Sequence, residues 1–185
     1  MSTAHRRPVA REGKRGLPRW ERSLRIARHR GRVLEAMGLL LLGAAAQKWV
    51  PMPRWSRVLG HHAAVPDAWL GQEVVRLPAI AASPVERQVA VAVKSGVQRL
   101  PFEPTCLAQA TAGQIMLRVR HSAGVVVIGL RPNPDGQDGR WDAHAWLLGR
   151  AGALTGGAAA RGFTAATVFQ VPQALTAAQV QLPGA

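Results

Sequence analysis

Hydrophobic residues follow helical spacing in three successive segments of the chain. The apolar run within residues 31–60 predicts a helix that two prolines near its end interrupt, because proline cannot continue a helix. Residues Ser83–Glu86 have the spacing of a capping box, and valines then repeat every four residues. A third start at 104–106 leads into apolar positions that continue to about residue 120. We therefore expect three helices in the first two-thirds of the chain.

The pattern changes to short strands after Gly124. The run Val125–Leu130 is dense in β-branched residues and too short for a typical buried helix, so it predicts a buried strand. A turn signal rich in Pro, Asn, Asp and Gly follows at 132–136. Further strands are predicted at Trp141–Leu148, Ala153–Thr155 and Phe163–Phe169. Helices followed by antiparallel strands indicate an α+β domain.

The predicted elements divide the 185 residues into four segments. Residues 1–30 are expected to be a basic flexible arm, disordered or loosely helical. An apolar N-terminal helix and an irregular segment, residues 31–82, should pack on the main core at 83–170. Residues 171–185 form an expected C-terminal tail. This length suffices for one domain with its own hydrophobic core.

The positive charge is concentrated at the N-terminus. The chain has a formal net charge of +14, and residues 1–32 supply eleven Lys or Arg against two Glu. This arm is either a solvated tail or a docking segment for an acidic partner, a nucleic acid or an anionic membrane. The apolar run at 37–46 is too short to span a bilayer, which takes about 20 residues. The basic region is also about twice the length of an ordinary signal-peptide n-region. A buried helix is therefore the favoured interpretation.

The single cysteine excludes an internal disulfide framework and a Cys-rich zinc site. This usage fits a reducing, cytoplasmic location. His61 and His62 lack a Cys or acidic partner at metal spacing, and no phosphate-binding loop motif is present. We therefore expect no metal and no cofactor.

Two residues have the positions that acyl-transfer chemistry requires. Cys106 lies in the first turn of its predicted helix, where the dipole and free N–H groups stabilise a thiolate and an oxyanion. His144 lies on a predicted strand between Trp141 and Trp146, as a candidate base. In the alternative interpretation, Cys106 is a small buried hydrophobe and His144 an ordinary core residue.

Three motifs occur together in this sequence: a Cys-Leu pair that opens a predicted helix, a Gly-preceded valine-rich strand, and the string Ala-His-Ala-Trp at 143–146. With these motifs the chain resembles the B2 proteins of lasso peptide biosynthesis, which are leader peptidases of the transglutaminase-like superfamily. The resemblance covers roughly residues 31–170. The order and separation of these motifs make the resemblance more specific than the Cys-Leu pair alone.

This resemblance implies a papain-like α+β fold in which residues 83–170 form the catalytic core, with the cysteine helix packed on an antiparallel sheet. Cys106 would attack the carbonyl between leader and core of a lasso precursor peptide, and His144 would relay the proton to complete hydrolysis. Implied partners are the precursor, a leader-recognition protein and a cyclase related to asparagine synthetase. Because only about 30 residues precede the first helix, recognition is expected from a separate chain. No nucleic acid partner is expected, and a peripheral membrane contact stays open.

The sequence departs from the family at the third catalytic residue. This is usually an Asp about a dozen residues after the His, yet no Asp or Glu follows Asp142. Thr155, a backbone carbonyl or Asp142 could orient His144, or the enzyme could be impaired, and the position stays unassigned. Two alternative functions follow: a catalytically impaired scaffold of the same fold that positions precursor and cyclase, or a basic binder of nucleic acid or membrane surfaces.

Overall fold

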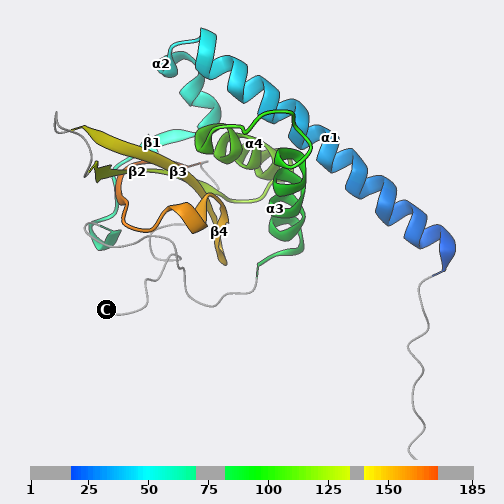
Figure 1. Cartoon of the computed structure of the whole chain (residues 1–185). Coiled ribbons are helices and arrows are strands. Elements are labelled where there is room, and N and C mark those ends of the chain that lie inside the picture. The colour runs from blue at the N-terminus through cyan, green and yellow to red at the C-terminus, as the bar shows by residue number, and fades with distance from the viewer. Residues whose placement is uncertain (1–17, 70–81, 134–139, 171–185) are drawn as a thin grey trace, which may run out of the picture.

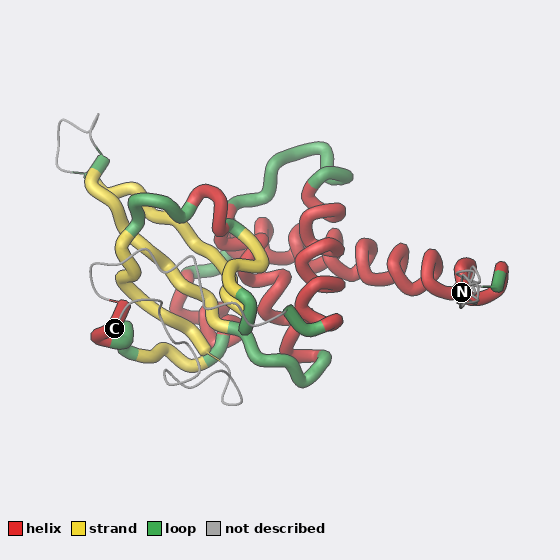
Figure 2. The backbone as a smooth tube through the Cα atoms, turned by 90° about the horizontal axis from the view of Figure 1, so that it is seen from below, coloured by secondary structure: helices red, strands yellow, loops and turns green. Residues whose placement is uncertain are grey.

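The computed structural model describes residues 18–69, 82–133 and 140–170. Four α-helices precede most of the sheet. They are the long helix α1 (Arg19–Trp49), the short helix α2 (Met52–Trp55), α3 (Pro84–Val97) and α4 (Cys106–Val119), which begins at the cysteine. Single 3₁₀ turns lie at Ser56–Leu59, Asp67–Trp69 and Gly157–Ala159. Figures 1 and 2 show the long helices gathered on one side of the sheet, with the N-terminal end of α1 extending beyond the rest of the molecule.

Five antiparallel strands form one sheet in the order β1-β5-β2-β3-β4. Their bounds are His61–Ala63, Val125–Pro132, Trp141–Gly149, Gly152–Thr155 and Thr164–Gln170, for β1 to β5 in turn. In the centre of the sheet, Val127 of β2 lies opposite Trp146 of β3 and Val168 of β5. Helices combined with an antiparallel sheet agree with the expected α+β class.

Helix α1 is longer than the sequence pattern predicts. It ends at Trp49, before the expected break at Pro51, but it begins at Arg19. Residues 19–30, which we expected in a disordered or loosely helical arm, belong to this helix. No proline follows Pro18 in this stretch, and Arg, Leu and Ala are good helix formers, so a helix anchored at its C-terminal half extends at little cost. Residues 1–17 and the expected tail at 171–185 lie outside the described residues.

The sheet separates two hydrophobic clusters. The first, between the helices and the sheet, contains residues of α1, α3 and α4 together with Val126, Ala145 and Leu147. The second covers the other face and contains Val127, Trp146, Leu148, Phe163 and Val168, among others. Successive residues of a strand point to opposite faces, so Ala145 and Leu147 face the helices while Trp146 and Leu148 face the second cluster.

The buried carboxylate of Glu86 joins α3 to the turn between β3 and β4. Its side chain accepts hydrogen bonds from the backbone N–H of Ser83 at 2.7 Å and of Arg150 at 2.7 Å. The Ser83 hydroxyl accepts from the Glu86 N–H at 3.1 Å, which confirms the predicted capping box. Glu86 therefore fixes the position of the sheet relative to α3.

We expect Glu86→Ala to lower the free energy of unfolding by about 3 kcal/mol, because two part-buried backbone donors lose a charged acceptor. Urea denaturation followed by circular dichroism measures this change. Glu103→Ala is the matched control, since Glu103 is exposed and should shift stability by less than about 0.5 kcal/mol. Equal stability of the two variants would contradict this role of Glu86.

Candidate active site

Cys106 is the first residue of α4, as the sequence predicts. The Thr105 hydroxyl caps the helix by accepting from the Ala108 N–H at 3.1 Å, and it donates to Gln47 Oε1 at 2.7 Å. The Gln109 side chain donates to the carbonyl of Pro104 at 2.9 Å. The helix start is therefore tied both to the C-terminal part of α1 and to the loop that precedes it.

The Cys106 thiol is free and half-buried, and its side chain packs against the cluster beneath the helices. The Thr105 hydroxyl accepts a hydrogen bond from the Ala108 N–H, and the Thr105 carbonyl oxygen accepts one from the Gln109 N–H. Within the described part of the chain, no hydrogen bond uses the N–H of Cys106 or Leu107. These two N–H groups lie at the N-terminal end of α4 and are available to donate hydrogen bonds to a developing oxyanion.

The imidazole of His144, on β3, is held by a hydrogen bond and by two aromatic rings. Nε2 lies 2.9 Å from the carbonyl oxygen of Gly156. Because a carbonyl can only accept, Nε2 carries the hydrogen, and Nδ1 of the neutral ring is left as an acceptor. The ring stacks on Trp146 with centroids 6.1 Å apart and tilts against Phe163 at 5.4 Å.

The Gly156 carbonyl contacts the imidazole of His144, for which the sequence left the orienting group unassigned. Gly156 follows β4, lies twelve residues after His144 and has a φ of 73°, which glycine adopts without a steric penalty. The Thr155 hydroxyl is buried and has no hydrogen-bond partner among the residues that the structure describes. Asp142 is paired with Arg131 at 3.0 Å instead of with His144. Of the alternatives weighed from the sequence, the structure has the backbone carbonyl in contact with the imidazole.

Cys106 and His144 lie on neighbouring elements but not in hydrogen-bond contact. Helix α4 packs on β3 so closely that a Cβ added to Gly113 would lie 2.5 Å from Leu147 Cδ2. The His144 ring, however, contacts Trp146 and Phe163 of the second cluster, whereas Cys106 packs against the first. No hydrogen bond between the thiol and the imidazole is present among the described residues. The expected pairing of Cys106 with His144 therefore stays a prediction.

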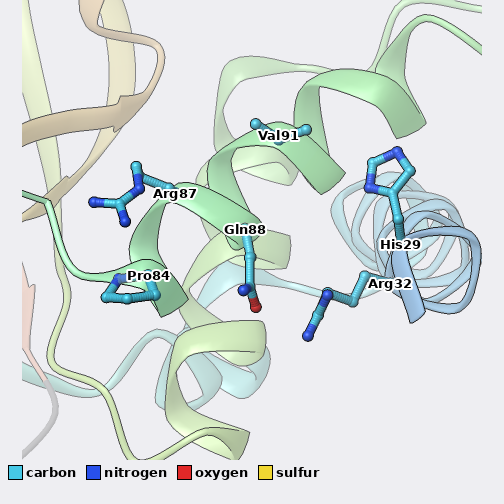
Figure 3. A pocket seen from close by; sticks show the side chains of 6 residues that line it. All are labelled: His29, Arg32, Pro84, Arg87, Gln88 and Val91. Atoms are coloured by element: carbon cyan, nitrogen blue, oxygen red, sulfur yellow. The ribbon is translucent and has the colours of Figure 1, made fainter. Parts of the chain in front are cut away.

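A cleft of about 220 Å³ lies elsewhere, between α1 and α3. Its lining includes His29 and Arg32 from α1 and Gln88 from α3 (Figure 3). Neither Cys106 nor His144 borders this cleft, and its lining residues include no cysteine, serine or threonine. It is therefore separate from the candidate active site.

A protein-family model matches a large part of this chain. The model of the transglutaminase-like superfamily matches residues 46–168, which is more than half of the chain and includes both Cys106 and His144. No curated protein and no solved structure matches the chain significantly. The fold of this superfamily is typical of cysteine-type peptidases and acyltransferases. The chain therefore belongs to the transglutaminase-like superfamily.

Proposed function

We propose that this protein is a cytoplasmic cysteine peptidase that cleaves a ribosomally made lasso precursor between leader and core. The hydrogen bond between His144 Nε2 and the Gly156 carbonyl is the observation that carries the proposal. It orients the imidazole as the missing acid would, and leaves Nδ1 available as a base. Family membership, the cysteine at a capped helix start and the Ala-His-Ala-Trp string support the same reaction.

In the proposed reaction, Nδ1 of His144 takes the thiol proton of Cys106, and the thiolate attacks the carbonyl of the scissile peptide bond. The N–H groups of Cys106 and Leu107 stabilise the resulting oxyanion. Collapse of the tetrahedral intermediate breaks the C–N bond, and the imidazolium protonates the departing amine of the core. Water, deprotonated by His144, then hydrolyses the leader thioester and regenerates the thiol.

The reaction requires Sγ and Nδ1 to approach within hydrogen-bond reach when the precursor is bound. Catalytic hydrogen bonds are often long or poorly aligned in free enzymes and tighten in the substrate complex. The proposal therefore includes a rearrangement at the α4–β3 contact on substrate binding. A separate leader-recognition protein would deliver the precursor, and a cyclase related to asparagine synthetase would consume the released core.

A second candidate function is a scaffold of the same fold that positions precursor and cyclase without cleaving. Two observations favour it: Cys106 and His144 pack against different clusters, and no Asp or Glu follows Asp142. A scaffold predicts that the precursor is bound but stays intact. Cleavage is therefore the property that separates the two functions.

The test is to incubate the full chain with a precursor peptide and a leader-recognition protein and to follow the products by mass spectrometry. A peptidase gives leader and core fragments whose masses sum to the precursor plus one water. Alkylation with iodoacetamide beforehand should stop the reaction, because the chain has one cysteine. An intact precursor that still co-purifies with the protein would reject the peptidase and support the scaffold.

A further inference from the structure

Helix α1 exposes large apolar side chains along its whole length. Trp49 is 73% exposed, Leu34 68% and Trp20 64%. Leu24, Leu41 and Leu42 are also exposed. Single exposed hydrophobic residues are ordinary, but a contiguous set on one element marks an interaction surface.

These residues form one continuous stripe. At about 100° per residue, the six large side chains lie within about 60° of one line along the helix, and the exposed residues Ala27, Gly31 and Gly38 lie on the same line between them. At about 1.5 Å per residue, the stripe from Trp20 to Trp49 is roughly 45 Å long. A Cβ added to Gly31 or Gly38 would find no atom within 4 Å, so nothing in the described structure covers this side. We call it the outer face of α1.

The outer face points away from the rest of the molecule. On the opposite side of the helix, Val33, Ala36 and Leu40 are buried against the first cluster. Nearer the N-terminus, His29 and Arg32 are directed towards the cleft beside α3 (Figure 3). The N-terminal end of α1 projects beyond the other helices and the sheet (Figures 1 and 2).

Basic residues flank the outer face on both sides. At about 100° per residue, Arg28 falls roughly 80° to one side of the stripe and Arg30 and Lys48 roughly 80° to the other. Helix α1 contains seven Arg or Lys and two Glu. One of those acids, Glu35, is paired with Arg120 at 2.5 Å, and this hydrogen bond raises the pKa of the arginine. The available charge beside the outer face is therefore positive.

We propose that the outer face of α1 binds the surface of an anionic lipid bilayer, with the helix lying in the plane of the interface. The apolar stripe would enter the headgroup boundary, Trp20 and Trp49 would anchor its two ends, and the flanking arginines would contact lipid phosphates. None of the helices in the described ranges is long and apolar enough to cross a membrane. A basic helix with one exposed apolar face suits the interface instead.

Charge favours a bilayer over a second copy of the chain. Two outer faces packed together would bring arginine flanks into proximity with few acids to pair them. A bilayer offers an apolar phase and negative headgroups at the same boundary. The family match begins at residue 46, so nearly all of this surface lies outside the matched domain. The inference does not depend on the proposed peptidase activity.

Cosedimentation of the full chain with vesicles tests this binding. We expect partitioning onto vesicles containing about 30% phosphatidylglycerol, at least about tenfold stronger than onto phosphatidylcholine alone, and a marked loss at high salt. Leu34→Glu together with Leu42→Glu should weaken binding by about tenfold or more. Val119→Glu is the matched control, because Val119 is 66% exposed at the end of α4, off the outer face.

The exposed glycines distinguish a lipid surface from a protein partner. Gly31→Leu with Gly38→Leu adds apolar area and should strengthen vesicle binding several-fold, whereas a helix packed closely over the glycines would be displaced. No binding to anionic vesicles by the folded wild-type chain would overturn the proposal. So would a dimer, detected by analytical ultracentrifugation, that the glycine substitutions disrupt.

Discussion

Replacing Cys106 with alanine is expected to lower the rate of precursor cleavage by about 10⁴-fold or more, because the reaction loses its nucleophile. Single-turnover reactions with a recognition protein present, resolved by mass spectrometry, measure this rate. The loss should appear in the chemical step and not in association with the precursor. His144→Ala should be similarly inactive, since the thiol then has no base.

Both variants need a stability control, since a misfolded protein would also be inactive. Cys106 and His144 are each half-buried, so either substitution should leave the urea midpoint close to that of the wild-type protein. Full processing of the precursor by Cys106→Ala would refute the peptidase. An inactive wild-type protein whose variants bind precursor and cyclase unchanged would identify the scaffold.

Gly156→Ala should lower cleavage by about 100-fold and destabilise the fold by about 2 kcal/mol. The alanine Cβ would lie 2.6 Å from the carbonyl oxygen of Ala145 and 3.2 Å from His144 Nε2. The φ of 73° adds a cost of about 1–2 kcal/mol for any residue with a Cβ. Relief of the clash must move the Gly156 carbonyl, so the imidazole loses the acceptor that fixes its orientation and tautomer.

Gly162→Ala is a close control for this substitution. Gly162 has a φ of 77°, but among the described residues an added Cβ would meet only Arg131 Cδ, at an ordinary 3.8 Å. It should share the backbone strain and keep nearly full activity. Because Gly156 is a positioning residue, its variant should also change the pH–rate profile, which reports the state of the imidazole. Equal activity of the two alanine variants would show that the carbonyl does not orient His144.

The group that orients His144 is a backbone carbonyl, whereas the family resemblance leads one to expect an Asp. A backbone carbonyl is neutral, so it fixes the histidine tautomer without the charge that an Asp would provide to an imidazolium. The imidazolium formed when the thiol gives up its proton would then be stabilised mainly by its ion pair with the Cys106 thiolate.

Local signals in the sequence determined where several elements begin and end. The capping box at Ser83–Glu86, the break before Pro51 and the helix start at Cys106 each depend on backbone groups within a few residues. The strand that begins at Val125 was predictable from its run of β-branched residues. Such features are predictable because the same short stretch contains both the donor and its acceptor.

Contacts between distant residues were decided only by the tertiary structure. Glu86 reaches the N–H of Arg150, and Gln114 donates to the carbonyls of Leu59 and Gly124, across separations that no local pattern encodes. The Gly156 carbonyl meets His144 through the pairing of β3 with β4 and a left-handed backbone conformation. Sequence alone could list the candidates for this position but could not choose among them.

The face of the sheet on which His144 lies was likewise decided only by the tertiary structure. Residues Ala145–Leu148 are all buried, because hydrophobic clusters cover both sides of the sheet. With apolar side chains on both faces, alternation along the strand does not reveal which face meets the cysteine helix. The sequence by itself therefore determined that a thiol opens a helix and an imidazole lies on a strand. Their relative placement depended on how helices and sheet pack, which is a property of the whole chain.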